Sequence, residues 1–205
     1  GQKVDSKKNP TDILILTVDN KFLGLSAKST KKISGGIGFK NPGLGTIERD
    51  LNINLKHHLE SAIDTAITKY ELPKSGAARK KIIRADSTIQ AATKKLGSDA
   101  MKSIRDDLYT KLSSLDQEAI RLYIYDAWMD SSTGLVPPYI KVTGNGSKGK
   151  YSATVINPLK NSKLDDFNSQ TISIEKLGNN SIGIKAGTKI LKMRIKFTSE
   201  PLASS

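Results

Sequence analysis

The stretch TDILILTVDNKFLGLSAK, residues 11–28, decides how this chain begins to fold. It contains two short apolar runs, residues 12–17 and 22–28, on either side of the turn-forming pair Asp19 and Asn20. Apolar runs around an Asp-Asn turn predict a β-hairpin with both strands largely buried. We therefore expect antiparallel pairing, with an acid opening the first strand and a lysine closing the second.

The register of this hairpin decides whether Asp12 and Lys28 meet. With a two-residue loop, Asp12 pairs with Ala27, and Lys28 falls on the opposite face of the sheet. With a three-residue loop, Asp12 lies opposite Lys28, and Ser26 shares their face while most apolar side chains take the other. Because the second register separates polar from apolar side chains, we predict the odd-numbered loop or a bulge with the same effect.

The rest of the chain alternates between loop, helix and strand patterns. A basic glycine-rich loop covers residues 29–46, and apolar residues then recur at helical spacing. The pattern predicts helices at residues 47–72, 75–96 (closed by Gly97), 98–112 and 115–129. After Pro137 and Pro138 it predicts strands at 139–143, 151–156, 171–176, 181–184 and 190–198, with a turn at 177–180.

These elements predict an α+β (mixed α/β) fold with a mixed sheet, a helical middle and a β-rich C-terminal part. We expect residues 1–134 to form the hairpin and helical region and residues 135–205 to form the basic β-rich part. A chain of 205 residues is long enough to hold both parts in one compact domain with a sizeable core.

The charge is strongly basic and unevenly distributed. Lys and Arg number 33 against 20 Asp and Glu, which gives a net charge of +13 and favours an anionic partner. Residues 1–40 hold 8 basic and 3 acidic side chains, residues 41–134 hold 14 and 13, and residues 135–197 hold 11 and 3. We therefore expect the two ends of the chain to face one polyanion, the alternative being a solvated basic surface without a partner.

The last predicted strand has the clearest pattern, because apolar and cationic residues alternate along it: Leu191, Met193, Ile195 and Phe197 with Lys192, Arg194 and Lys196. This alternation predicts one core face and one cationic face. The cationic face fits two interpretations, phosphate contact or an edge strand protected by lysines.

Several kinds of chemistry are excluded or disfavoured by composition. The absence of cysteine rules out disulfides and thiolate sites and fits a reducing compartment, so we expect a cytoplasmic protein. No apolar run approaches the roughly 20 residues that span a bilayer. The polar faces of the predicted helices mix both charge signs, which argues against a membrane-surface protein.

A glycine-rich segment and a pair of histidines resemble a nucleotide-binding loop and a metal site, but neither fits the residue pattern that such a site requires. The segment from Gly144 to Lys150 fits the first part of a phosphate-binding P-loop, but Tyr151 stands where Ser or Thr is required, so we interpret it as a lysine-rich hairpin touching phosphate. His57 and His58 are adjacent on a predicted helix and cannot form the i, i+4 metal pair, so we interpret them as exposed helix residues.

The first hairpin resembles the active-site motif of the PD-(D/E)XK nuclease superfamily, most closely that of the type II restriction endonucleases. The resembling residues are Pro10-Thr11-Asp12 on the first strand and Ser26-Ala27-Lys28 on the second, followed by Ser29-Thr30 and the basic loop. The resemblance implies a restriction-endonuclease-like mixed sheet. It also implies that Asp12 binds Mg²⁺, that the Ala27 carbonyl adds a ligand and that Lys28 helps to activate water.

Two positions depart from the family pattern. One extra residue, Thr11, separates Pro10 from Asp12. Ser26 stands where the family usually has Glu or Asp. Because a serine hydroxyl is a weak metal ligand, either a carboxylate comes from elsewhere, with Glu60 and Asp5 as candidates, or one metal suffices. The expected catalytic set is therefore Asp12, Ser26 and Lys28.

The sequence thus predicts a Mg²⁺-dependent endonuclease of a restriction system that hydrolyses phosphodiester bonds in double-stranded DNA. A homodimer would suit symmetric cutting of a palindrome. The expected DNA-binding residues are Lys31, Lys32, Lys40, Lys141, Lys148, Lys150, Lys192, Arg194 and Lys196. The alternative function is that of a non-catalytic nucleic-acid-binding protein with a nuclease-like fold, which Ser26 favours. The alternative interpretation of the motif itself is purely structural: Asp12 begins its strand in a turn, and Lys28 ends its strand in solvent.

Overall fold

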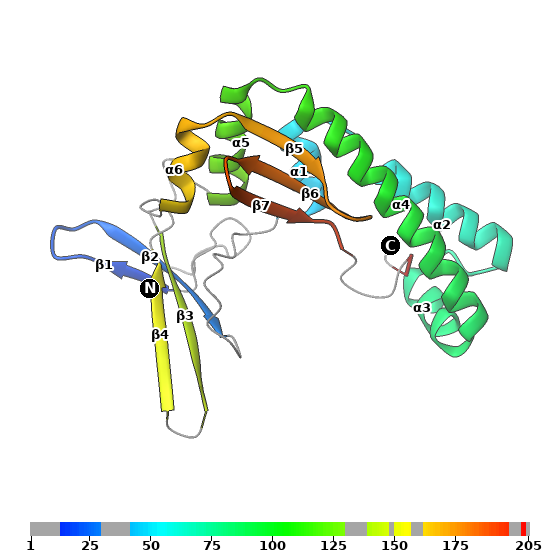
Figure 1. Ribbon diagram of the computed structural model, residues 1–205. Coiled ribbons are helices and arrows are strands. Elements are labelled where there is room, and N and C mark those ends of the chain that lie inside the picture. Colours follow the sequence, from blue (N-terminus) through cyan, green and yellow to red (C-terminus); the bar gives the residue numbers. More distant parts are fainter. Residues whose placement is uncertain are drawn as a thin grey trace. The chain divides into compact units, whose positions relative to one another are not determined.

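The computed structural model describes residues 13–29, 42–129, 139–147, 150–156, 162–196 and 202–203, and confirms an α+β fold (Figure 1). Its elements, in chain order, are β1 (Ile13–Leu16), β2 (Phe22–Ser29), α1 (Leu44–Leu51), α2 (Lys56–Tyr70), α3 (Gly76–Ala85), α4 (Ser87–Ser113), α5 (Gln117–Met129), β3 (Tyr139–Ser147), β4 (Lys150–Ile156), α6 (Ser162–Ser169), β5 (Ile172–Lys176), β6 (Ser181–Ala186) and β7 (Lys189–Arg194). Within these ranges, none of the helices is both long and apolar enough to cross a bilayer.

The chain forms two compact units, and each combines segments that are distant in the sequence. The first unit takes residues 1–42 and 117–171, and the second takes residues 43–116 and 172–205. The expected boundary between residues 134 and 135 therefore falls inside the first unit. The second unit draws together the helices of the middle and the last three strands.

The first unit contains a four-stranded mixed sheet in the order β1-β2-β3-β4. β1 and β2 are antiparallel, β2 and β3 are parallel, and β3 and β4 are antiparallel. The long helical segment between β2 and β3 supplies the crossover that a parallel pair requires. The mixed sheet expected from the sequence is therefore present, with β2 in its interior.

The first hairpin is confirmed, but its register differs from the predicted one by two residues. Ile13 pairs with Leu25 and Leu16 with Phe22, so the loop is odd-numbered but has five residues instead of three. Thr17 explains the longer loop: its amide N donates to the Lys21 carbonyl at 2.8 Å and its Oγ1 donates to the same oxygen at 2.7 Å. The Lys21 amide in turn donates to Thr17 Oγ1 at 3.1 Å, and the Thr17 carbonyl accepts from the Asn20 amide at 3.0 Å, so regular pairing ends at Leu16 and Phe22.

The expected burial of both hairpin strands is wrong for β1. Ile13 is 53% exposed, Ile15 is 39% exposed and Leu16 is 57% exposed. Among the described strands, β1 is the edge of the sheet and pairs with β2 alone, so within this part of the chain its apolar side chains lack the second neighbour that an interior strand has. The expectation holds only in part for β2, where Gly24 is buried, Leu23 and Leu25 are half-buried and Ala27 is exposed.

The predicted helix at 47–72 is two helices, because Asn52 takes the left-handed conformation with φ of 48° and ends α1. The Glu48 side chain then accepts hydrogen bonds from the amides of Leu55 at 2.8 Å and Lys56 at 2.7 Å, which caps the start of α2. Leu51 at the end of α1 and Leu55 just before α2 are both buried.

The next two predicted helices are divided at Asp86 instead of at Gly97. The Asp86 carboxylate accepts from the amides of Thr88 and Ile89 and forms the N-cap of α4. α4 then continues through Gly97, which is buried inside it. The side chain at residue 86, and not the glycine, therefore sets the helix boundary. The helix α6 was not predicted.

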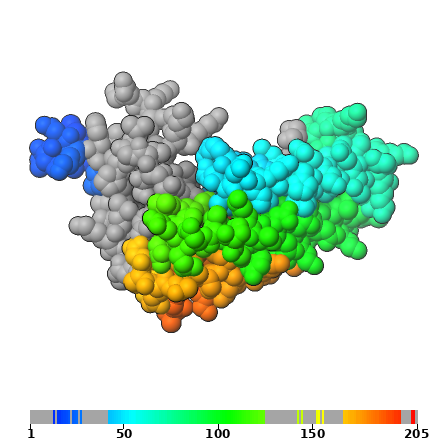
Figure 2. Space-filling view, turned by 90° about the horizontal axis from the view of Figure 1, so that it is seen from above, coloured from blue at the N-terminus to red at the C-terminus, as the bar shows by residue number. Residues whose placement is uncertain are grey.

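The core of the second unit lies between the helices and reaches the end of the chain. α2 and α4 pack side by side, as Figure 2 shows in cyan and green. Ala62, Ala66, Ile83 and Ala100 are buried in one apolar cluster with Leu202 near the C-terminus. This packing fixes the positions of the side chains on α2 and α4.

The second sheet has the antiparallel order β5-β6-β7 and packs one face on α4. Ile182, Ile184 and Met193 are fully buried. The turn predicted at 177–180 is present, since the Leu177 amide donates to the Ser181 carbonyl at 2.8 Å and Gly178 has a φ of +62°. The three C-terminal strands therefore follow their sequence pattern closely.

Candidate functional site

The hairpin that resembles a nuclease motif is only partly described. Asp12 lies outside the described residues, while Ser26, Ala27 and Lys28 lie in β2. The expected pairing of Asp12 with Lys28 does not follow from the observed register, in which Ile13 pairs with Leu25. The register of β1 instead points to Ser26 as the next partner on β2.

The parallel strand β3 adds a basic residue beside this motif. Ser26 pairs with Lys141, Ala27 with Val142 and Lys28 with Thr143. Neighbouring strands lie about 4.8 Å apart, so the backbone of Lys141 runs directly beside that of Ser26. Sequence patterns did not predict this neighbour, because the two residues are separated by all five helices between β2 and β3.

The remaining predicted DNA-binding residues of the first unit are described only in part. Lys31, Lys32, Lys40 and Lys148 lie outside the described residues. Lys150 opens β4 and pairs with Ser147 at the end of the β3–β4 hairpin. The lysine-rich hairpin expected after residue 143 is thus present as two paired strands.

The cationic face of β7 is the best-described part of the candidate interface. Lys192 and Arg194 of β7 and Lys196 just beyond its end are exposed, and Leu191, Met193 and Ile195 between them are buried. The strand predicted at 190–198 therefore ends earlier, at Arg194, although the alternation continues to Lys196. The predicted alternation of core and cationic residues is therefore confirmed over residues 191–196. Phe197, the last residue of the predicted pattern, lies outside the described residues.

Two features of the same sheet shape this face. Gly183 pairs with Lys192, and a Cβ at Gly183 would lie 2.9 Å from Leu177 Cδ1, so glycine leaves room for the leucine side chain. Lys185 Nζ forms an ion pair with Glu175 at 3.4 Å. Because Glu175 partly neutralises Lys185, the net positive charge of this sheet face lies on β7.

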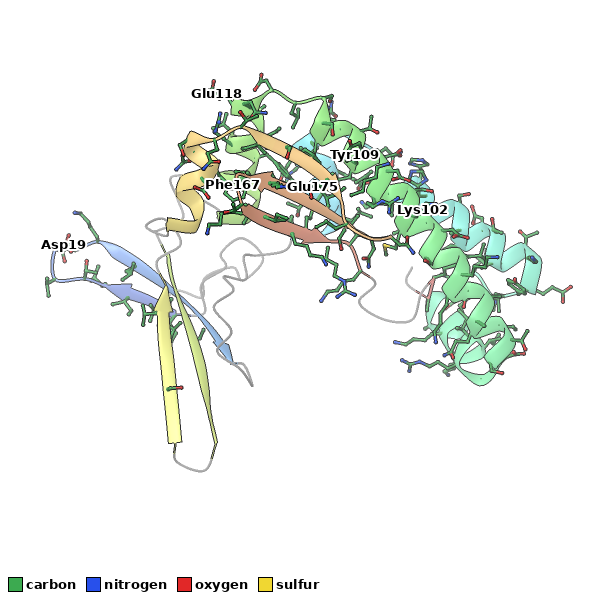
Figure 3. All side chains as sticks on the ribbon, in the orientation of Figure 1. Asp19, Lys102, Tyr109, Glu118, Phe167 and Glu175 are labelled. Atoms are coloured by element: carbon green, nitrogen blue, oxygen red, sulfur yellow. The ribbon has the colours of Figure 1, made fainter. Side chains whose placement is uncertain are left out.

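On the other side of the sheet, an ionic network attaches β5 to α4. Lys176 Nζ lies 2.7 Å from Asp106 Oδ1 and 4.8 Å from the centre of the Tyr109 ring. Figure 3 labels Tyr109 on α4 and Glu175, the residue before Lys176, on β5. The hydrogen bond from Lys176, and to a smaller extent the one from Arg105, holds the pKa of Asp106 below its usual range. Arg105 also donates to the Gly178 carbonyl in the turn that leads to β6. This network helps to hold the sheet that presents β7.

A second cluster of side chains joins α2 and α4, and sequence patterns missed it. His58 Nε2 lies 2.6 Å from Asp107 Oδ2, and the ring centres of His57 and His58 are 3.8 Å apart. His57 is exposed, as predicted, whereas His58 is half-buried. No sequence signal could have found this group, because Asp107 is 49 positions from His58.

Comparison of the chain with protein-family models, curated proteins and solved structures found no match.

Proposed function

We propose that this protein is a Mg²⁺-dependent DNA endonuclease of restriction type that uses the β1–β2 hairpin for catalysis. The observation that carries the proposal is the location of Ser26-Ala27-Lys28 on the interior strand of a mixed sheet, next to the start of β1. An interior strand holds its backbone from both sides, which suits a site that must fix a metal and a water. The resemblance to restriction endonucleases calls for the same kind of sheet.

In the proposed mechanism, Asp12 and the Ala27 carbonyl would hold Mg²⁺, which prefers oxygen ligands. The metal would polarise the scissile phosphate and lower the pKa of a bound water, while Lys28 would orient that water or stabilise the developing charge. The mechanism requires the pairing of β1 to extend by one residue. Asp12 would then lie opposite Ser26 and diagonal to Lys28, at a separation of about 7–8 Å.

Ser26 shapes the metal requirement of this proposal. It supplies no carboxylate, Asp5 lies outside the described residues, and Glu60 is exposed on α2 in the second unit. We therefore propose one catalytic metal held chiefly by Asp12. DNA is the substrate, the cytoplasm is the proposed compartment, and a homodimer would allow both strands of a palindrome to be cut.

The test is a plasmid cleavage assay with full-length protein in Mg²⁺ or Mn²⁺. Asp12→Ala and Lys28→Ala should each lower the cleavage rate by at least about 100-fold, because each removes a group that acts on the reacting phosphate or water. Lys21→Ala and Asp64→Ala are matched controls, since both side chains are exposed and both should leave cleavage unchanged. Activity retained by either hairpin variant removes that residue from the mechanism.

The second candidate function is nucleic-acid binding without cleavage. It is favoured by Ser26 at the acid position and by the exposed cationic face of β7. The same assay separates the two functions when binding to DNA is measured in parallel. Salt-sensitive binding without cutting in either metal would support the binding protein and contradict the nuclease.

A further inference from the structure

Two neighbouring histidines and one aspartate converge between α2 and α4. His57 and His58 lie in the first turn of α2, and Asp107 lies in the second half of α4. One potential ligand atom from each of the three residues lies within 4.8 Å of the other two. Packing between α2 and α4 holds the group together, since the two helices contact along the core of the second unit.

The hydrogen bonding of His57 prepares it to act as a ligand. His57 Nδ1 lies 3.1 Å from the Asn54 carbonyl, which can only accept, so Nδ1 carries the proton. The neutral ring then has its free lone pair on Nε2. Metal-binding histidines usually donate their other ring N–H to a carbonyl or carboxylate in this way. The Asn54 carbonyl thus fixes the tautomer and the orientation of the ring.

The types of donor atom select the metal. Two imidazoles and one carboxylate suit Zn²⁺, which accepts nitrogen and oxygen ligands at about 2.0–2.2 Å, whereas Mg²⁺ prefers oxygen ligands and water. In a tetrahedral site with such bonds the ligand atoms lie about 3.3 Å apart. The separation of 2.6 Å between His58 and Asp107 would open slightly, and the wider separations, all within 4.8 Å, would close by small side-chain movements.

We propose that His57, His58 and Asp107 bind one zinc ion that joins the first turn of α2 to α4, with water as the fourth ligand. Zinc at His58 Nε2 requires the neutral ring with its proton on Nδ1, so the hydrogen that Nε2 shares with Asp107 is exchanged for one on Nδ1 of the same ring when the metal binds. The proposal is independent of the hairpin nuclease site, because all three ligands belong to the second unit. A zinc ion here would stabilise the helical core that supports the C-terminal sheet.

The alternative explanation is that His58 and Asp107 form only a hydrogen bond between the helices. His57 separates the two explanations, because it is exposed and takes no part in that bond. The test is titration of the metal-free full-length protein with ZnCl₂ by calorimetry, together with thermal unfolding with and without zinc. Wild type should bind one zinc per chain and unfold at a higher temperature when zinc is present.

Three variants and two controls complete the design. His57→Ala, His58→Ala and Asp107→Asn should each weaken zinc binding by at least the roughly 10- to 100-fold that loss of a supporting group costs a metal site. Asp64→Asn, which changes an exposed acid further along α2, and Asp12→Ala, which changes the hairpin, should bind zinc as wild type does. MgCl₂ titrated into Asp12→Ala, which lacks the proposed hairpin ligand, should give no binding.

The proposal is overturned if wild type shows no zinc binding, or if His57→Ala binds zinc and gains thermal stability as wild type does. Because His57 is exposed, His57→Ala should fold even if His58→Ala does not. If Asp12→Ala alone loses zinc binding, the zinc ion binds at the hairpin and not between α2 and α4, which also contradicts the proposal. Cleavage activity is not used as a readout, so the nuclease proposal and the zinc proposal fail separately.

Discussion

At the scale of single residues, Glu48 connects two helices that the sequence pattern merges. Its carboxylate accepts from the amides of Leu55 and Lys56 and forms an ion pair with Lys56 Nζ at 3.2 Å. Leu55, at the N-cap position of α2, has no side chain that can make such bonds. Burial tends to raise the pKa of Glu48, but these hydrogen bonds and the Lys56 charge outweigh it, so the pKa lies below its usual value.

This shift predicts a pH-dependent contribution of Glu48 to stability. Its pKa is lower in the folded protein than in the unfolded chain, so the contribution is complete above about pH 4.5 and disappears as pH falls through the folded value. Glu48→Gln should lower the free energy of unfolding by about 1 kcal/mol at pH 7, since charged hydrogen bonds become neutral ones. The difference in free energy of unfolding between Glu48→Gln and wild type should become smaller as the pH is lowered to 3. Urea unfolding of both proteins between pH 7 and pH 3 measures this difference.

Glu60→Gln is the matched control for Glu48→Gln, because Glu60 is an exposed glutamate on α2, the helix whose start the Glu48 carboxylate of α1 caps. It should unfold like wild type at every pH. A difference between wild type and Glu48→Gln that stays constant down to pH 3 would contradict the role of the ionised carboxylate.

At the scale of elements, the N-cap at Asp86 separates α3 from α4. Its Oδ1 accepts from the amides of Thr88 at 2.8 Å and Ile89 at 3.0 Å. Asp86→Ala should destabilise the protein by about 1 kcal/mol, whereas Asp86→Ser should keep most of the stability because serine also caps. Chemical denaturation compares the two variants. Equal losses in both would mean that the boundary of α4 does not depend on this cap.

The sequence predicted the strands well and the helix boundaries poorly, for a physical reason. Hairpins and alternating strands depend on local turn residues and on a period of two, both of which are visible in the sequence. The break between α1 and α2 is hidden because Leu51 and Leu55, four residues apart, are buried on both sides of it. Gly97 was interpreted as a helix end, but tertiary packing keeps it inside α4.

The candidate sites also fall into two groups: one that local sequence patterns predict and one that depends on contacts between distant segments. The cationic face of β7 was predictable because strand alternation alone places Lys192 and Arg194 opposite the core. The juxtaposition of Lys141 with Ser26 and the pairing of His58 with Asp107 were not, because both depend on contacts between distant segments. The two-residue error in the hairpin register arose from the Thr17 bonds, which lengthen the loop.

At the scale of the whole molecule, both units are basic although the middle of the sequence is nearly neutral. The first unit has 14 Lys and Arg against 8 Asp and Glu, and the second has 19 against 12. The second unit gains much of its excess from the last strands, which return to pack on α4. An anionic partner is therefore attracted to each unit, and overall charge alone cannot identify which surface it touches.

Salt dependence of DNA binding distinguishes a specific surface from overall charge. Each phosphate contact contributes about 0.9 to the slope of log binding constant against log salt concentration. If β7 contacts the backbone, the double variant Lys192→Ala/Lys196→Ala should flatten the slope by about 1.8 and weaken binding at low salt. Fluorescence anisotropy of a labelled duplex over a range of NaCl concentrations measures both quantities.

The control for this prediction is Lys94→Ala/Lys95→Ala, which removes the same charge from exposed positions on α4. Because the net charge of both double variants is identical, any difference between their slopes reports contact and not general attraction. If both variants flatten the slope equally, DNA responds only to total charge. If neither does, the bound phosphates lie elsewhere, and β7 is an edge strand whose lysines serve to prevent pairing with another sheet.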